Sequence, residues 1–480
     1  MSGLFGVVTS KPCATDLFYG TDYHSHLGTR RAGLSTIDNG VIHLNIHNIE
    51  NTQFKTKFVT DIHEMLGNQG IGVISDSDAQ PIVCNSHLGR FAVCTVSRIN
   101  NIDELEQLCL SKNQQFTELS MGRTNPTELI ALLITQGKTF ADGINNVYQH
   151  VRGSVSFLIL TNDGIIAARD RYGRTPLIIG HRGNDYAVAS ETHSYVNLGY
   201  KTEYFVKPGE AVMISHTGLK SLIQPSDKMQ ICSFLWIYYG YPCVEYEDIN
   251  AEEVRFRLGE AMGKNDDVEA DYVSGIPDSG VGMALGYAAG KGIPYKRGIL
   301  KYTPTWARSF MPPTQTLRDH IAHMKLIPIP SLLRGQRILF CDDSIVRGTQ
   351  LRDTARILYG YGVKELHARI ACPPLLFGCP FLNFSRSRGN LELIARRVIL
   401  EMTGKDDDDT ARRFADPDSP EYAEMVRRIE KKLGLTSLAY QRIDDCLASI
   451  GIPADRLCTY CWTGKDGPAC ASCPHHCQGK

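Results

Sequence analysis

Short apolar runs, separated by glycine, asparagine and aspartate, recur through the first 220 or so residues of the chain. The clearest runs lie at 40–49, 89–96, 155–170 and 210–218. Such runs between closely spaced turn residues predict antiparallel strands. A helix is expected near 127–136, in the sequence TELIALLITQ. This half of the chain is therefore predicted to be α+β, with packed sheets.

The pattern changes near residue 250, where predicted helices begin to alternate with predicted strands. The expected helices lie at 251–264, 281–292 and 351–361, and the expected strands at 268–280, 338–350 and 363–374, the first two leading into turns. This alternation predicts an α/β domain with a parallel sheet. The highly charged stretch 404–432 is expected to be a solvated loop leading into an exposed helix. We place the domain boundary between residues 1–225 and 226–480.

Composition narrows the class of partner. The 480 residues are 42% hydrophobic and 21% charged, with a formal net charge of −1. A charge near zero gives no case for nucleic acid or an anionic membrane as the main partner. The longest apolar runs, such as 155–160, are too short to span a bilayer, and the N-terminus lacks the pattern of a signal peptide. We expect a cytoplasmic protein.

Two predicted turns carry polar residues suited to a sugar phosphate. In an open parallel sheet, ligands bind beyond the carboxyl ends of the strands. Asp342 and Asp343 follow such a strand, and could accept hydrogen bonds from two vicinal hydroxyls or help hold a hydrated Mg²⁺. The backbone N–H groups and side chains that follow could bind a phosphate dianion before the next helix: Ser344, Arg347, Gly348 and Thr349. Together these groups predict a ribose 5-phosphate site.

The second turn, Gly275-Ile-Pro-Asp-Ser-Gly280, also joins a strand to a helix, and its amides could cradle a diphosphate. Each turn has a plainer interpretation. The first could be an acidic helix cap, and the second an ordinary glycine–proline turn. The occurrence of both in one predicted sheet favours a binding site.

These motifs resemble a known family. CDDSIVRGT at 341–349 resembles the phosphoribosyl-diphosphate signature of type I phosphoribosyltransferases. Taken with GIPDSG at 275–280 and the stretches 292–301 and 307–326, it resembles glutamine phosphoribosylpyrophosphate amidotransferase, also called amidophosphoribosyltransferase. The resemblance implies an N-terminal Ntn-hydrolase-like α+β sandwich, followed by a type I phosphoribosyltransferase domain. It also implies a homo-oligomer that forms 5-phosphoribosylamine, the first step of purine biosynthesis.

The resemblance also assigns roles to particular residues. Positions that match its Mg²⁺–diphosphate site are Ser279, Asp342 and Asp343, with Pro277 and Asp278 in the same turn, and Ser344 to Thr349 match its 5-phosphate loop. Lys301 and Arg308 fall in a loop that closes over the substrate in the family, where they would neutralise the departing diphosphate. Here that loop, KYTPTWARSF, has an extra residue and a proline relative to the family pattern.

Cysteines cluster at the C-terminus, where five of the fifteen lie: Cys458, Cys461, Cys470, Cys473 and Cys477. In a reducing compartment this clustering indicates metal or cluster ligation rather than disulfides. The resemblance implies a [4Fe–4S] cluster held by Cys232, Cys379, Cys458 and Cys461. The alternative is Zn²⁺ on the C-x₂-C-x₈-C-x₂-C pattern of Cys458, Cys461, Cys470 and Cys473.

Two further expectations concern the remaining cysteines. Cys470, Cys473 and Cys477, with His475 or His476, could bind a second metal. Cys94 and Cys372 are expected to be buried small apolar residues.

The glutaminase residues implied by the resemblance are mostly missing. The family's nucleophile is an N-terminal cysteine, whereas Ser2 occupies this position, and its hydroxyl is a weaker nucleophile than a thiol. The substrate-binding arginine is absent from VISDSDAQP at 73–81, and the Asn-Gly of the oxyanion hole is absent from SRINN at 97–101. Pro126 replaces the aspartate that holds the substrate amine. Arg30 or Arg31 is the remaining candidate from the family's LQHRG region.

Two classes of function follow. In the first, the chain is an enzyme that couples phosphoribosyl diphosphate to free ammonia, to ammonia from another protein, or to another small amine or nitrogen base. In the second, it is a non-catalytic chain that binds phosphoribosyl diphosphate or senses oxygen, and regulates a full amidotransferase by hetero-oligomerisation. The intact Asp-Asp turn favours the enzyme, because drift in a non-catalytic chain should also have eroded it.

Overall fold

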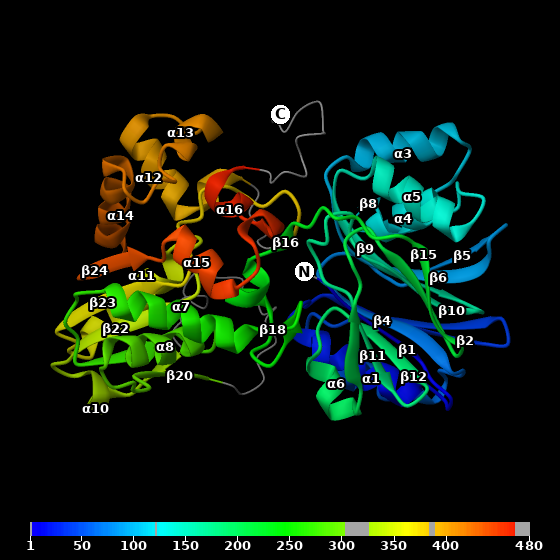
Figure 1. Cartoon of the computed structure of the whole chain (residues 1–480), viewed down its shortest axis with the longest axis horizontal. Coiled ribbons are helices and arrows are strands. Elements are labelled where there is room, and N and C mark those ends of the chain that lie inside the picture. Colours follow the sequence, from blue (N-terminus) through cyan, green and yellow to red (C-terminus); the bar gives the residue numbers. More distant parts are fainter. Residues whose placement is uncertain (1, 121, 303–325, 384–388, 466–480) are drawn as a thin grey trace.

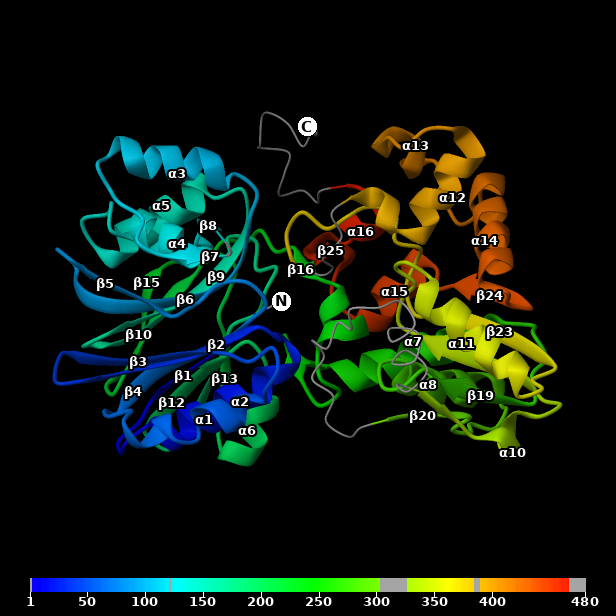
Figure 2. The ribbon, with the colours of Figure 1, turned by 180° about the vertical axis from the view of Figure 1, so that it is seen from behind.

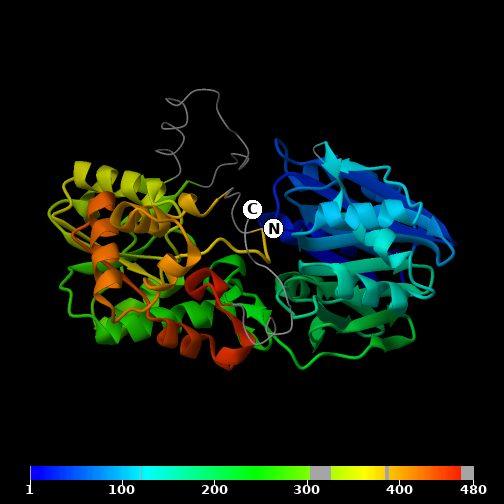
Figure 3. The same cartoon turned by 90° about the horizontal axis from the view of Figure 1, so that it is seen from above.

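The computed structural model describes residues 2–120, 122–302, 326–383 and 389–465. These residues form two lobes that lie side by side (Figure 1). The view from above separates the lobes along the long axis, with the start of the chain near their junction (Figure 3). The predicted boundary at residue 225 falls between the last strand of the first lobe and the short strand that leads into the second.

Two antiparallel sheets form the centre of the N-terminal lobe. The seven-stranded sheet has the order β13-β11-β12-β1-β4-β2-β3. Its strands are β1 (Gly3–Val8), β2 (Arg31–Asp38), β3 (Val41–Asn48), β4 (Gln69–Ser75), β11 (Ile178–Arg182), β12 (Asp185–Ala189) and β13 (Lys201–Phe205). The six-stranded sheet has the order β15-β14-β10-β9-β6-β5. Its strands are β5 (Ile82–Ser86), β6 (Gly89–Ile99), β9 (Gly153–Thr161), β10 (Gly164–Ala168), β14 (Ala211–Ser215) and β15 (Gly218–Ile223).

Helices cover the outer faces of both sheets, so the lobe has four layers (Figures 1 and 2). The first sheet carries α1 (Ala14–Tyr23), α2 (Phe54–Phe58) and α6 (His193–Leu198), and the second carries α3 (Ile102–Ser111), α4 (Pro126–Ile134) and α5 (Phe140–His150). Alternate strand residues such as Leu4, Val73 and Leu158 fill the space between the sheets. The predicted α+β sandwich and the helix near 127–136 are confirmed.

The C-terminal lobe contains the predicted parallel sheet. Its strands run in the order β19-β22-β23-β24, and every neighbouring pair is parallel. They span β19 (Tyr272–Gly275), β22 (Arg337–Asp342), β23 (Glu365–Ile370) and β24 (Ser437–Tyr440). Helices α7 (Ala251–Asn265) and α8 (Val281–Lys291) lie on one face and α11 (Thr349–Gly360) on the other (Figures 1 and 2). The predicted α/β architecture is therefore confirmed.

Small residues let α7 and α8 pack with their backbones in contact. A Cβ added at Gly259 would lie 1.9 Å from the carbonyl oxygen of Met283, and one at Gly286 would lie 1.9 Å from that of Phe256. The start of α7 is fixed by Asn250, whose side chain accepts hydrogen bonds from the N–H groups of Glu252 and Glu253. Because α8 follows the GIPDSG turn directly, this close packing also fixes the position of that turn.

The charged stretch 404–432 differs from its prediction. Its aspartates are not merely solvated: the fully buried guanidinium of Arg396 lies 2.6 Å from Asp406 and 3.0 Å from Asp408. The following helix, α14 (Pro420–Leu433), buries Met425 and Ile429 on one face. A buried charge needs a partner, and these acids supply it. Among the described residues, no helix is both long and apolar enough to cross a membrane.

Candidate functional site

The Asp-Asp turn lies at the carboxyl end of β22, at the predicted edge of the sheet. Asp342 is the last residue of the strand, and its Oδ1 accepts a hydrogen bond from the Asp343 N–H at 3.0 Å. Asp343 is buried, and its Oδ2 accepts a 2.6 Å hydrogen bond from the Ser344 hydroxyl. Burial and repulsion from Asp343 raise the pKa of Asp342 well above its usual range, and burial raises the pKa of Asp343.

The GIPDSG turn packs directly against this pair. The Ile276 N–H donates to the Cys341 carbonyl oxygen at 2.9 Å, and a Cβ at Gly280 would lie only 2.2 Å from the same oxygen. The Ser279 hydroxyl lies close enough to Asp343 to oppose the rise in the pKa of that carboxyl. The structure thus places the serine of one turn beside the aspartate of the other.

Lys301 also reaches this edge of the sheet. It ends β20 (Ile299–Lys301), and its Nζ lies 2.5 Å from Oδ2 of Asp278, the acid of the GIPDSG turn. Both side chains are substantially exposed, so the ammonium can move to another anion at little cost. Pro277 precedes Asp278 in the same turn. The other predicted cation of this loop, Arg308, lies outside the described residues.

The predicted phosphate loop leads into α11. Gly348 is the N-cap of this helix, with φ of +76°, a left-handed conformation that glycine adopts without strain. Arg347 pairs with Glu392, and its carbonyl oxygen accepts a 2.6 Å hydrogen bond from Arg397. Thr349, the first residue of the helix, is exposed. The loop thus presents its exposed residues at a helix N-terminus, where an anion is favoured.

Sequence reasoning missed one charged residue of this region. Arg255 of α7 is buried, and its guanidinium donates to the carbonyl oxygens of Trp236 at 3.0 Å and Gly240 at 2.7 Å. It also attracts Asp343 electrostatically and lowers the pKa of that carboxyl. No signal in a single sequence distinguishes it from other arginines of an amphipathic helix.

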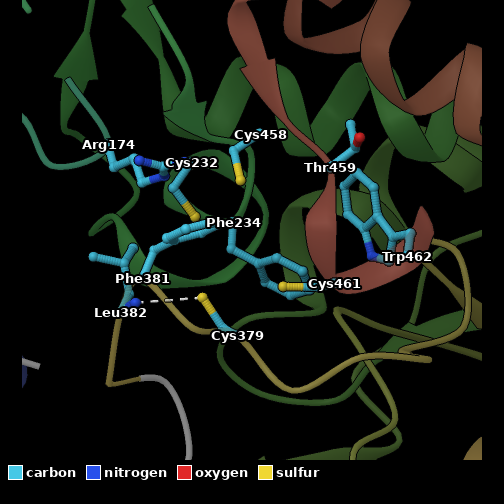
Figure 4. Close-up of a pocket in the computed structure, with 10 residues that line it drawn as sticks. All are labelled: Arg174, Cys232, Phe234, Cys379, Phe381, Leu382, Cys458, Thr459, Cys461 and Trp462. Atoms are coloured by element: carbon cyan, nitrogen blue, oxygen red, sulfur yellow. Dashed lines mark hydrogen bonds between the residues drawn. The ribbon is translucent and has the colours of Figure 1, made fainter. Parts of the chain in front are cut away.

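The four cysteines predicted to share a ligand line one small cavity: Cys232, Cys379, Cys458 and Cys461. Figure 4 shows their sulfurs around a common space, with Arg174, Phe234 and Phe381 beside them. The strand pairing of β16 (Ile231–Cys232) with β25 (Leu457–Cys458) sets Cys232 opposite Cys458. Sequence positions more than 200 residues apart are thus brought together at the lobe junction.

The thiols of this group differ in their electrostatics. Burial disfavours the thiolate of Cys379, but hydrogen bonds from Cys461 and from the N–H groups of Phe381 and Leu382 outweigh it and lower the pKa of Cys379 to about 7. Burial raises the pKa of Cys232 well above its usual range. Cys94 and Cys372 are fully buried, as predicted. Cys470, Cys473 and Cys477, which the zinc alternative and the second metal site require, lie outside the described residues.

The segment that should bind a substrate carboxylate carries acids instead. Asp76 accepts hydrogen bonds from the Thr29 N–H at 2.8 Å and from its hydroxyl at 3.0 Å. Asp78 is buried, accepts a 3.0 Å hydrogen bond from the Thr127 hydroxyl, and has its pKa raised by burial. Two carboxyl groups in this segment would repel a carboxylate substrate unless they were protonated.

The other predicted glutaminase positions have structural partners. The Ser2 hydroxyl donates to that of Ser75 at 3.3 Å, and Pro126 begins α4 behind its N-cap, Asn125. In SRINN, Arg98 donates to the Leu382 carbonyl oxygen at 3.4 Å, and the neighbouring Asn100 donates to that of Pro380 at 2.8 Å. Arg30 lies 3.0 Å from Glu50, and Arg31 begins β2. The SRINN segment thus binds the chain next to Cys379.

Replacing Asp342 with asparagine tests the repulsion in the Asp-Asp turn. The pKa of Asp342 is raised on folding, so its ionisation destabilises the fold as the pH rises above the unfolded value of about 3.9. Asp342→Asn keeps an acceptor for the Asp343 N–H and removes the charge. We expect a higher Tm than the parent at pH 7, by about 2–4 °C for each kcal/mol gained, with the difference disappearing near pH 4.

The matched control for this comparison is Asp418→Asn. Asp418 is exposed, and its hydrogen bond from Arg442 lowers its pKa, so its removal should give no gain in Tm at pH 7. A Tm for Asp342→Asn that is equal to or below the parent value at pH 7, measured by thermal unfolding without ligands, would contradict the repulsion.

Comparison with known proteins places this geometry in a family. Residues 69–197 match the family described as glutamine amidotransferase domain. The amidophosphoribosyltransferase of Synechocystis is 30% identical, covering 96% of this chain and 90% of its own length, and that of Bacillus subtilis is 29% identical over 96% and 93%. The solved glutamine phosphoribosylpyrophosphate amidotransferase from B. subtilis, complexed with ADP and GMP, superposes with a TM-score of 0.82 at 28% identity, covering 96% of each chain. The chain belongs to the amidophosphoribosyltransferase family.

Proposed function

We propose that this chain converts phosphoribosyl diphosphate and ammonia into 5-phosphoribosylamine and diphosphate, and that its N-terminal lobe no longer hydrolyses glutamine. The observation that carries the proposal is the contrast between the two lobes. Ser279, Asp342, Asp343 and Lys301 converge at one edge of the parallel sheet. The predicted glutamine site has Asp76 and Asp78 in its carboxylate-binding segment and lacks a cysteine nucleophile.

The Asp-Asp turn would hold the ribose. The carboxylate oxygens of Asp342 and Asp343 accept hydrogen bonds from the 2- and 3-hydroxyls, and the loop from Ser344 to Thr349 holds the 5-phosphate at the N-terminus of α11. Adjacent carboxyl oxygens beside the Ser279 hydroxyl also suit Mg²⁺, which prefers oxygen ligands. When bound, Mg²⁺ would neutralise diphosphate charge.

The reaction breaks the bond between the anomeric carbon and the diphosphate oxygen. Its electron pair leaves with diphosphate, and Lys301, released from Asp278, stabilises the developing charge. The nitrogen lone pair of ammonia forms the new bond to the oxocarbenium-like carbon, and the resulting protonated amine loses a proton to solvent. Water must be excluded, because it would hydrolyse the same carbon.

The reaction rate with glutamine, compared with the rate with ammonium, tests whether the N-terminal lobe still hydrolyses glutamine. Loss of one oxyanion-hole donor alone costs about 100- to 1000-fold. This chain lacks the family's Asn-Gly, its cysteine and its arginine, so we expect glutamine to support less than about 1% of the rate that ammonium supports at raised pH. The measurement is 5-phosphoribosylamine formation by purified, anaerobically prepared protein, with the product identified by mass spectrometry.

The outcomes of this assay are distinct. Glutamine turnover equal to that with ammonium would refute the loss of glutaminase activity. A product containing another amine would identify a different acceptor. No product with any donor would favour the non-catalytic regulator, whose effect should then survive the paired changes Asp342→Asn and Asp343→Asn.

We also propose that the four cysteines hold a [4Fe–4S] cluster rather than a single Zn²⁺ ion. Four thiolates around one zinc lie about 3.8 Å apart, since each Zn–S bond is about 2.3 Å. Among the described residues, no three cysteine sulfurs lie within 4.8 Å of one another. Although Cys379 and Cys461 lie close together, the set as a whole is spread more widely than one zinc ion requires, which supports a cluster in which each sulfur binds a different iron. When bound, the cluster would tie β16 to the C-terminal segment.

Metal analysis of anaerobically purified protein tests the cluster. We expect about four iron and four sulfide per chain in the parent, and loss of most of both in Cys379→Ser, because one ligand of four is removed. Cys84→Ser, which changes a partly exposed cysteine of the N-terminal lobe, is the control and should retain the cluster. Stoichiometric zinc without iron would overturn the assignment.

Two further expectations from the sequence, a homo-oligomer and a cytoplasmic location, remain predictions.

A further inference from the structure

A second group of metal-ligating side chains lies in the N-terminal lobe, next to the chain segment that enters the transferase lobe. His26 ends the short 3₁₀ helix η1 (His24–His26), Glu191 follows β12, and His193 begins α6. One ligand atom from each residue lies within 4.8 Å of the other two. Glu191 and His193 are buried, with 2% and 6% of their surface exposed, and His26 is partly exposed.

Both imidazole rings are oriented by one backbone carbonyl. Nδ1 of His26 lies 3.2 Å from the Tyr23 carbonyl oxygen, and Nε2 of His193 lies 2.6 Å from the same oxygen. A carbonyl oxygen only accepts hydrogen bonds, so both of these ring nitrogens carry the proton. In each neutral ring, the other nitrogen therefore presents a lone pair.

Those two lone pairs face a carboxylate. Nε2 of His26 lies 2.8 Å from Oε2 of Glu191, and Nδ1 of His193 lies 3.3 Å from the same oxygen. Nδ1 of His193 is buried and has no hydrogen-bond partner among the described residues. Three acceptors that converge in this way repel one another unless a cation lies among them. A histidine that donates one nitrogen to a carbonyl and directs the other at a common point has the usual arrangement of a metal ligand.

Only one oxygen of Glu191 is directed at the two imidazole rings. The other oxygen of Glu191, Oε1, accepts a 2.7 Å hydrogen bond from the Tyr246 hydroxyl, a neutral donor. Oε2 of Glu191 and the two ring nitrogens therefore face the same point.

We propose that His26, Glu191 and His193 bind one divalent transition-metal ion, for which Zn²⁺ is the best match. Two imidazoles and one carboxylate suit zinc, whereas Mg²⁺ and Ca²⁺ prefer oxygen ligands throughout. Three protein ligands leave a fourth tetrahedral position for water. This site is separate from the four cysteines, and it shares none of their residues.

The proposed site connects the two lobes. The Tyr241 ring stacks on His193, with centroids 5.7 Å apart, and the Glu245 N–H donates to the Thr192 hydroxyl at 3.0 Å. Tyr246, which donates to Glu191, packs against Trp236 of the transferase lobe. A bound ion would therefore fix η1 and the start of α6 against the 241–246 segment.

Zinc binding to the full chain tests the proposal. We expect chelator-treated protein to regain one more Zn²⁺ per chain than the His193→Gln variant, and zinc affinity at this site to fall at least about 100-fold in the variant. Added zinc should raise the Tm of the parent and not that of His193→Gln. His181→Gln is the control, because His181 forms an exposed pair with Glu203 at 3.2 Å, and it should behave as the parent does.

The visible spectrum of bound Co²⁺ distinguishes this site from the four-cysteine site. Co²⁺ bound by nitrogen and oxygen should give visible bands without sulfur-to-metal charge transfer, and these bands should disappear in His193→Gln. His26→Gln changes a more exposed ligand and should give the same loss if His193→Gln does not fold. Equal zinc content and affinity in the parent and both folded variants would overturn the proposal, as would a cobalt spectrum due to thiolates alone. Either result would mean that a proton, not a metal ion, lies among the three groups.

Discussion

The repulsion between two neighbouring carboxylates at the end of β22 is the constraint on which the transferase lobe depends. Burial and mutual repulsion raise the pKa of Asp342, so its ionisation at neutral pH destabilises this edge of the sheet. The surrounding structure partly offsets this cost: Ser344 donates to Asp343, Ser279 lies beside it, and Arg255 attracts it. A ligand that supplies hydroxyl donors or a cation would reduce the remaining repulsion between the two carboxylates. The stability of this edge of the sheet should therefore rise when such a ligand binds.

Backbone packing makes this arrangement possible. The GIPDSG turn reaches the Asp-Asp turn because Gly280 lies against the Cys341 carbonyl, where no larger residue fits without displacement. Helix α8 follows that turn and packs on α7 through glycines at the contact. Small residues in two helices and one turn therefore determine where Ser279 lies relative to Asp343.

The N-terminal lobe has the sandwich of its family, and the proposed loss of glutaminase activity leaves this lobe with a structural role. Arg98 and Asn100, in the segment that corresponds to the family's oxyanion hole, donate to the carbonyl oxygens of Leu382 and Pro380. These contacts lie beside Cys379, and Arg98 contributes to lowering the pKa of that thiol. The segment thus holds the cysteine-bearing chain of the other lobe, which would be a physical reason to retain the N-terminal lobe under the proposed loss of glutaminase activity.

Sequence alone predicted the features that depend on local pattern. The alternation of strands and helices after residue 250, and the turns at Gly275–Gly280 and Asp342–Thr349, follow from short-range spacing. It did not predict the group of His26, Glu191 and His193, because folding brings together residues that are 165 positions apart in the chain. The pairing of buried Arg396 with Asp406 was missed for a different reason: charge in a sequence does not reveal which arginine is buried.

Calorimetric titration of phosphoribosyl diphosphate into the purified chain, with magnesium present, tests whether the Asp-Asp turn binds this sugar phosphate. We expect saturable binding at one site per chain. This binding should be lost when both carboxylates become amides in Asp342→Asn with Asp343→Asn, and retained in Asp353→Asn, an exposed change on α11. The absence of measurable binding by the folded parent chain would contradict this expectation.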